Sequence, residues 1–295
     1  MNVKKISVFT AIAAVPVMAI GLILHSLGTP DPTAAQPDIT ASLIRMLITS
    51  LAMFMPLAAV IVTQLIYKEP IFKGMDISFK INRWWFSGWL LMPVVALGIL
   101  GMSLLMPGAY WNGDSETIQM ALKQMPEGIG LGGFIGITIL SGLMAGATIN
   151  ALFAFGEEIG WRGFLIKEMK GVKFMKASLI IGAIWGLWHF PLILNGHNYP
   201  QHHVIGVFMM ILMCMTLTPI LNYFRLKSGS VIVPAIMHGT INAVVGLSNM
   251  LVAPQNDLLI GGPGLAGIIV FILTDVALFY YDRYISKEHL FTSEL

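Results

Sequence analysis

Long apolar segments separated by short polar ones run through the whole chain. Read as segments of about 20 residues, the length that an α-helix needs to cross a bilayer, they predict eight membrane spans: 6–27, 39–66, 84–107, 133–156 and onward, 177–194, 203–224, 231–252 and 260–280. The composition agrees, since 56% of the 295 residues are hydrophobic and only 11% are charged, against roughly 25% charged in a soluble protein. The mean hydropathy is +0.79. The sequence therefore predicts an all-α, polytopic membrane bundle.

The basic residues predict the orientation of these spans. If the N-terminus is cytoplasmic, all of the 17 Lys and Arg residues fall on the cytoplasmic side except Arg45 and Lys123. The outer connections carry acidic residues instead: Asp31, Asp38, Asp114, Glu116, Glu127 and Asp257. An excess of Lys and Arg marks the cytoplasmic side of a membrane protein. We therefore expect both termini in the cytoplasm.

No connection between the spans is long enough to fold as a separate soluble domain. The longest, 67–83 and 108–130, both contain Gly and Pro, and the single cysteine, Cys214, lies inside an apolar segment. The chain carries no nucleotide-binding loop and no basic patch for nucleic acid. We expect one membrane domain over residues 1–295, in contact with the lipid bilayer and without a nucleic-acid partner. The oligomeric state stays open.

Three charged residues lie where the hydropathy places the chain inside the membrane. Glu157, Glu158 and Arg162 belong to the string Glu-Glu-Ile-Gly-Trp-Arg at the end of the fourth span. Ionisable residues are costly in hydrocarbon and usually mark function. Glu158 and Arg162 are four residues apart and can pair on one helical face. Glu157 is rotated by about 100° from Glu158, has no local partner, and suits a general base or a metal ligand. Alternatively, the three residues only hold helices together.

The fourth apolar segment is longer than a straight crossing needs. It continues from residue 133 to 167, which at about 1.5 Å per residue exceeds the thickness of the bilayer core. We expect a tilt or a bend, and Gly156, Gly160 and Gly163 are candidate positions for it.

Two further spans each carry a histidine. One contains Trp185-Gly-Leu-Trp-His189, and the other contains His238-Gly-Thr-Ile-Asn242. Counted from the cytoplasmic side, Glu157 and these His and Asn residues lie at similar depths of about 10 to 18 Å. A lone histidine in a span more often bonds one helix to another. Acid, imidazole and amide at one depth on three helices instead predict a polar catalytic pocket.

Three more histidines follow the fifth span in an outer connection. His197, His202 and His203 lie close together in the sequence. Such a cluster could bind a metal ion, but we expect a solvated loop.

The motifs resemble those of the CPBP family, which comprises the CAAX proteases and bacteriocin-processing proteins and includes the type II prenyl endopeptidases. The family pattern is Glu-Glu-x-x-x-Arg, Phe-x-x-x-His and His-x-x-x-Asn, and all three motifs occur here in order within about residues 145–245. Trp185 replaces the phenylalanine, so an aromatic ring remains. The resemblance implies an intramembrane endopeptidase. By this resemblance, Glu157 and His189 activate a water molecule. His238 and Asn242 stabilise the oxyanion. Glu158 and Arg162 complete the set of catalytic residues by holding the acidic helix in register.

The same resemblance implies zinc as a candidate cofactor, because the family is assigned to the metallopeptidases. Glu157, His189 and His238 would be its ligands. One carboxylate and two imidazoles with an open fourth position form a known catalytic zinc pattern. The sequence has no His-Glu-x-x-His helix, so a metal-dependent and a metal-free mechanism both stay open.

Three hypotheses follow. The first is an endopeptidase of a bacterial cytoplasmic membrane whose active site opens toward the cytoplasm and takes a peptide or membrane-protein substrate. Because the strings are similar to those of bacterial members, a prenylated substrate is only one option. The second is a non-catalytic peptide-binding or bacteriocin-immunity protein that uses the same pocket. The third is a proton-coupled transporter.

Overall fold

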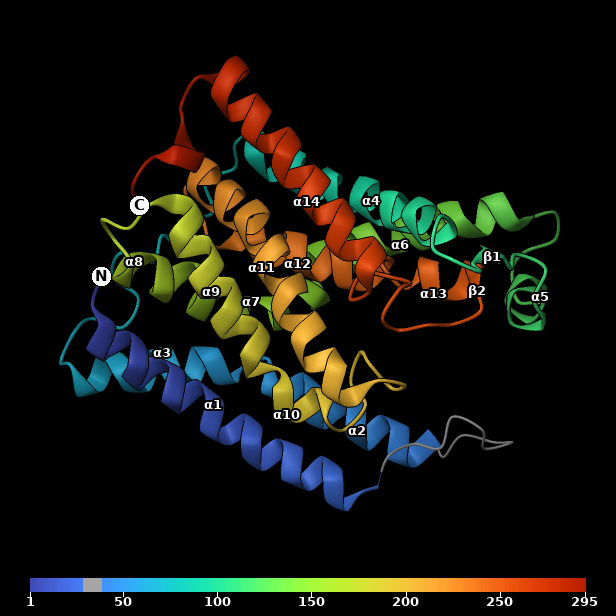
Figure 1. Cartoon of the computed structure of the whole chain (residues 1–295), viewed down its shortest axis with the longest axis horizontal. Helices are drawn as coiled ribbons and strands as arrows, with labels where there is room; N and C mark the ends of the chain where they lie inside the picture. Colours follow the sequence, from blue (N-terminus) through green and yellow to red (C-terminus); the bar gives the residue numbers. More distant parts are fainter. Residues whose placement is uncertain (29–38) are drawn as a thin grey trace.

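The structure is a computed structural model that describes residues 1–28 and 39–295, so the predicted outer residues Asp31 and Asp38 lie outside the described part. The described chain is almost entirely helical (Figure 1). Its elements are α1 (Val3–Ser26), α2 (Ile39–Ala52), α3 (Met55–Ile66), α4 (Arg83–Leu104), β1 (Tyr110–Trp111), α5 (Glu116–Lys123), α6 (Leu131–Ala147), α7 (Ile149–Glu158), the π-helix η1 (Ile159–Leu165), α8 (Ile166–Glu168), α9 (Phe174–Trp188), α10 (Phe190–Ile193), α11 (His203–Ser228), α12 (Ile232–Val244), α13 (Leu247–Leu251), β2 (Val252–Ala253), α14 (Leu265–Tyr280), the π-helix η2 (Tyr281–Ser286) and the 3₁₀-helix η3 (Leu290–Thr292).

The all-α membrane bundle predicted from the sequence is confirmed. Among the described residues, six helical segments are long and apolar enough to cross a membrane: Val3–Ser26, Thr40–Ile66, Arg83–Leu104, Phe174–Ile193, His203–Ser228 and Leu265–Ser286. The bent pair Leu131–Ala147 and Ile149–Glu168 makes a seventh if it is one span. The predicted span 231–252 is instead the 13-residue α12 followed by the short α13. The count of eight spans and the cytoplasmic termini stay predictions.

The expected bend in the fourth apolar segment lies elsewhere than at the three candidate glycines. The axes of the two halves differ by 52° at Thr148, where the backbone leaves the helical region. Gly156 and Gly160 instead allow close packing, because an added Cβ would lie 2.6 Å from the carbonyl oxygen of Met53 and 2.7 Å from Pro56 Cβ, respectively. The chain then widens into the π-helix η1, a feature that is frequent at functional sites.

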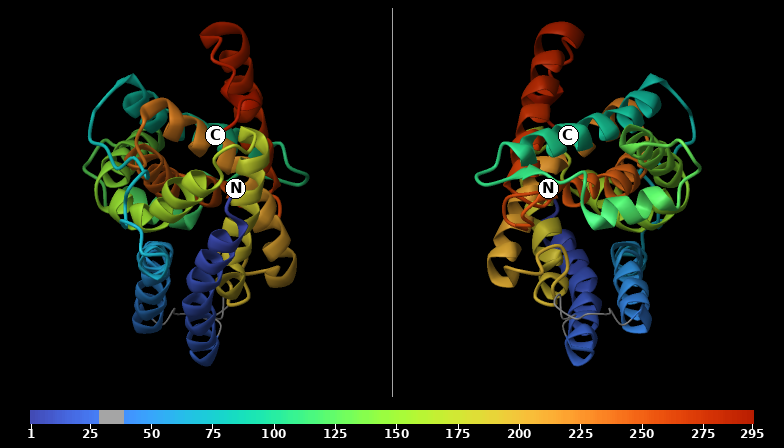
Figure 2. Two further views of the ribbon diagram at one scale, coloured as in Figure 1. Left: turned by 90° about the vertical axis from the view of Figure 1, so that its left-hand side faces the viewer. Right: turned by 90° about the vertical axis from the view of Figure 1, so that its right-hand side faces the viewer.

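Small residues let the central helices approach one another closely. In α9, a Cβ on Gly182 would lie 2.6 Å from the Cα of Met215 in α11, and one on Gly186 would lie 2.5 Å from the Cα of Ile211. Helices in membranes commonly pack through such small residues. α12 lies against α4, α6 and α7. Figure 2 shows α14 on one side of this centre and α1 with α3 on the other.

The two ends of the bundle are defined by hydrogen bonds between distant segments. At one end, the Asn2 amide donates to the carbonyl of Glu168 and the Phe174 amide donates to that of Ser293. We call this the terminal end, because both chain termini lie there (Figure 1). The opposite, distal end holds the connections 194–202 and 254–264, which the Tyr199 hydroxyl joins by donating to the carbonyl of Pro263.

A buried lysine closes the terminal end. The Lys5 Nζ atom lies 2.7 Å from Glu69 Oε2 and 2.9 Å from Glu168 Oε1, and its side chain is 1% exposed. Because the Glu168 side chain is only 8% exposed, loss of the lysine leaves a largely covered carboxylate without its nearest counter-charge. We expect Lys5→Ala to lower the free energy of unfolding by about 1–3 kcal/mol, measured by thermal unfolding in detergent. The exposed neighbour provides the control variant, Lys4→Ala, which should change it little.

Candidate active site

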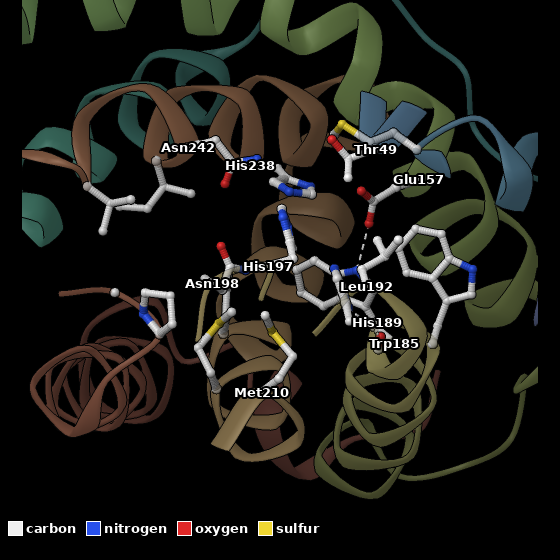
Figure 3. Close-up of a pocket in the computed structure, with 18 of the residues that line it drawn as sticks. Thr49, Glu157, Trp185, His189, Leu192, His197, Asn198, Met210, His238 and Asn242 are labelled. Atoms are coloured by element: carbon white, nitrogen blue, oxygen red, sulfur yellow. Dashed lines mark hydrogen bonds between the residues drawn. The ribbon is translucent and has the colours of Figure 1, made fainter. Parts of the chain in front are cut away.

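A cavity of about 310 Å³ lies among the central helices (Figure 3). Glu157 from α7, His189 from the end of α9, and His238 and Asn242 from α12 all line it. The structure thus brings together four of the six site residues named from the sequence. The other two, Glu158 and Arg162, are fully buried and do not line the cavity.

Glu157 is held by two indole groups. Its Oε2 atom accepts a hydrogen bond of 2.7 Å from Trp185 Nε1 and one of 3.4 Å from Trp161 Nε1. The side chain points into the cavity in Figure 3. Among the described residues, no hydrogen bond is made to Oε1. One carboxylate oxygen is therefore fixed while the other is available to a molecule in the cavity.

Glu158 and Arg162 form the ion pair that their spacing predicts. Arg162 Nη1 lies 2.9 Å from Glu158 Oε1, and both side chains have no exposed surface. The guanidinium also donates to Thr218 Oγ1 at 3.0 Å and lies over the Trp185 ring at 4.3 Å from its centre. Glu158 Oε1 is in addition 2.8 Å from His238 Nδ1. The ion pair therefore links the ring of His238 to the helix that carries Glu157.

In both His189 and His238, Nδ1 bonds a protein oxygen and Nε2 is the ring nitrogen without a partner among the described residues. His189 Nδ1 lies 2.8 Å from the carbonyl oxygen of Trp185. Because a carbonyl oxygen only accepts, Nδ1 carries the hydrogen and Nε2 is an acceptor in the neutral ring. His238 Nδ1 faces the carboxylate of Glu158, so its Nε2 is likewise the atom left for a ligand. Neither Nε2 atom has a hydrogen bond within the described residues.

Trp185 contacts four of the site residues: Glu157, Arg162, His189 and His238. Its indole donates to Glu157, its ring lies under Arg162, its carbonyl accepts from His189, and its ring packs edge-on against His238 with centres 5.4 Å apart. The sequence indicated only an aromatic ring at this position. A phenylalanine would keep the ring contacts, but it lacks the N–H group that fixes Glu157.

His197 is a cavity residue that the sequence did not reveal, and the solvated loop expected there is only partly correct. His197 and Asn198 line the cavity (Figure 3), and burial lowers the pKa of His197. The loop turns inward because Tyr199 is fully buried beside Gly206, a contact that is not visible in the local pattern. His202 bonds Asp257 instead, and His203 bonds the carbonyl of Pro200.

The candidate zinc ligands do not form a metal site as they stand. Among the described residues, no group of three or more His, Cys, Asp and Glu side chains is placed to hold a metal ion. Zinc would be held through Glu157 Oε1 and the Nε2 atoms of His189 and His238, because Glu157 Oε2 and both Nδ1 atoms already have partners within the protein. The zinc ligand set stays a prediction.

Comparisons with known proteins match a central part of the chain that contributes most of the residues lining this cavity. Residues 139–244 match the family model of the type II CAAX prenyl endopeptidase, Rce1-like proteins. This segment is similar to the CAAX proteases. It contains the Glu-Glu-x-x-x-Arg, Trp-x-x-x-His and His-x-x-x-Asn motifs, and it spans α7, α9 and α12, which position Glu157, His189 and His238.

A curated relative shows the same similarity to the CAAX proteases. The CAAX prenyl protease 2 of Methanococcus maripaludis is 31% identical over 146 residues, which is 47% of this chain and 50% of the relative. The chain thus spans about half the length of the curated CAAX protease that it matches. The similarity is confined to the part of the chain that carries Glu157, His189 and His238.

The separate environments of Glu157 and Glu158 predict that two substitutions differ strongly in their effect on stability. Arg162→Met leaves the Glu158 carboxylate buried without its counter-charge, and we expect a loss of about 3–5 kcal/mol. Glu157→Gln keeps an oxygen that accepts from Trp185, so we expect a change below about 1 kcal/mol. Thermal unfolding in detergent measures both. Equal losses in the two variants would contradict the separate roles of the adjacent acids.

Proposed function

We propose that this protein is an intramembrane endopeptidase that hydrolyses a peptide bond inside the cavity. The observation that carries the proposal is that Glu157, His189 and His238 line one cavity within an apolar bundle, each with a carboxylate oxygen or Nε2 atom that makes no hydrogen bond among the described residues. The match of this segment to the CAAX proteases supports it. A bacterial cytoplasmic membrane is the proposed location, as the motif strings suggest.

In the proposed mechanism, Glu157 and the Nε2 atom of His189 orient a water molecule and remove its proton as it attacks the peptide carbonyl. The hydroxide oxygen forms a bond to the carbonyl carbon, and the carbonyl oxygen becomes an oxyanion. When this intermediate collapses, the C–N bond breaks and the proton passes to the leaving amine. Such acid–base catalysis contributes about 10²- to 10⁴-fold in rate.

The oxyanion is stabilised by the opposite wall of the cavity. The Asn242 amide supplies N–H donors, and a doubly protonated His238 donates through Nε2 while Nδ1 donates to Glu158. Asn242 and His238 are four residues apart on α12 and line the cavity together. Fixed donors in a site shielded from water stabilise a developing charge strongly.

The size and lining of the cavity suit a short peptide segment. Its volume of about 310 Å³ lies at the small end of ligand pockets, so a folded domain does not enter. The proposed partner is a peptide or membrane-protein substrate. The name of the archaeal relative refers to prenyl proteins, and a prenylated substrate is one candidate here.

Loss of either histidine should abolish cleavage without unfolding the protein. We expect His189→Ala and His238→Ala to lower the rate of peptide-library cleavage by at least about 100-fold. His203→Ala is the matched control, because that ring bonds a loop carbonyl outside the cavity. If both cavity variants cleave at the wild-type rate, the catalytic assignment fails. If no variant or wild type cleaves any peptide but all keep a biological effect, the binding or immunity hypothesis gains support.

The indole N–H of Trp185 can be tested by restoring the residue of the family pattern. Trp185→Phe keeps the ring but removes the hydrogen bond to Glu157, and we expect kcat to fall about 10-fold because the carboxylate is less well oriented. Trp89→Phe removes an indole bond to the carbonyl of Leu143, away from the cavity, and should leave kcat unchanged. Equal kcat values for Trp185→Phe and the wild type would show that the hydrogen bond from Trp185 to Glu157 does not contribute to catalysis.

Elemental analysis and chelation test the cofactor. Protein that contains far less than one zinc per chain and still cleaves in the presence of a chelator would establish the metal-free mechanism. Stoichiometric zinc that is lost in Glu157→Gln together with chelator-sensitive cleavage would instead establish the zinc-dependent mechanism.

A further inference from the structure

The cavity extends from Glu157 toward the distal end of the bundle. Its rim includes His197 and Asn198 from the connection before α11 and Gly262 and Pro263 from the connection before α14. Both connections belong to the distal end, opposite the two termini. No lining residue within 1–28 and 39–295 comes from the segments that meet at the terminal end, 66–83, 166–174 or 281–295.

Tightly packed side chains separate Glu157 from the terminal end. Trp161, Arg162 and Phe164 of the π-helix η1 have no exposed surface. Below them, Arg225 donates to the carbonyl oxygens of Arg162 and Met75 and is 2% exposed. Because this layer is filled by large side chains and by backbone hydrogen bonds, a peptide has no path to Glu157 through it.

The charges of the chain distinguish the same two ends. The helix ends and connections of the terminal end carry most of the lysine and arginine: Lys4, Lys68, Lys73, Lys80, Arg83, Lys167, Lys170, Lys173, Lys176, Lys227, Arg283 and Lys287. They also carry the acidic residues Glu69, Asp76, Glu168, Asp282, Glu288 and Glu294, but the positive-inside rule counts only lysine and arginine. The described connections of the distal end carry Lys123 with the acidic Asp114, Glu116, Glu127 and Asp257. By the positive-inside rule, the terminal end is cytoplasmic.

We propose that the cavity is entered from the outer, non-cytoplasmic face of the membrane and that its substrate is a peptide segment presented on that face. This inference rests on the proposed function for the nature of the occupant, but the direction of access stands on geometry and charge alone. It reverses the opening toward the cytoplasm that the sequence suggested, because the depth of the motifs does not reveal which side of them is filled.

The lining indicates the chemistry of that segment. Part of the wall is apolar and consists of Met210, Met213, Leu217, Ile241 and Phe271. Among the lining residues, Glu157 is the only acidic one and no lysine or arginine is present. An uncharged, apolar stretch, such as the outer end of a membrane-spanning helix, matches this wall better than a charged peptide does.

Cysteine labelling tests the direction of access without any need for activity. In a Cys214→Ala background, single cysteines are placed at the rim (His197→Cys), inside the cavity (Ser50→Cys) and at the terminal end (Lys170→Cys). Spheroplasts are treated with a membrane-impermeant maleimide before or after permeabilisation. We expect His197→Cys and Ser50→Cys to be labelled in intact spheroplasts, and Lys170→Cys to be labelled only after permeabilisation.

The reverse pattern, with Lys170→Cys labelled in intact spheroplasts and His197→Cys only after permeabilisation, would overturn the proposal. So would the absence of labelling at both cavity positions while Lys170→Cys reacts. Since labelling does not require catalysis, outer access together with no peptide cleavage would refute the proposed function and leave the direction of access intact.

Discussion

The carboxylate of Glu158 and the guanidinium of Arg162 have no exposed surface, and the rest of the site is arranged around them. Through this pair the π-helix η1 is joined to Thr218 of α11, to His238 of α12 and to the Trp185 ring of α9. Breaking one partner of a buried ion pair is strongly destabilising. The four elements are therefore held in one relative position, which in turn fixes the distances across the cavity.

The adjacent acids have separate tasks because a helix turns by about 100° per residue. Glu158 faces the interior of the bundle, where its carboxylate pairs with Arg162 and contacts His238. Glu157 faces the cavity and is bound by two neutral indoles. One turn of chain thus supplies both a fixed framework and a carboxylate that is available for reaction.

Much of this arrangement followed from the sequence, because helical periodicity and hydropathy act locally. The i,i+4 pair of Glu158 and Arg162 and the common depth of Glu157, His189 and His238 needed only the rise and twist of a helix. The break at Thr148, the shortness of α12 and the inward turn at His197 depend on contacts between distant segments. The direction of the cavity depends likewise on how Trp161, Phe164 and Arg225 fill the space below Glu157, which spacing along the chain does not encode.

The central claim is that the Glu157 carboxylate drives hydrolysis in this cavity. Its most direct test is the cleavage rate of Glu157→Gln, compared with the wild type at equal concentrations of folded protein in detergent. The amide keeps the size of the side chain and an acceptor for Trp185, but it cannot take a proton from water. We expect Glu157→Gln to cleave at least about 100-fold more slowly than the wild type, with an unchanged unfolding temperature. Cleavage at the wild-type rate would contradict it.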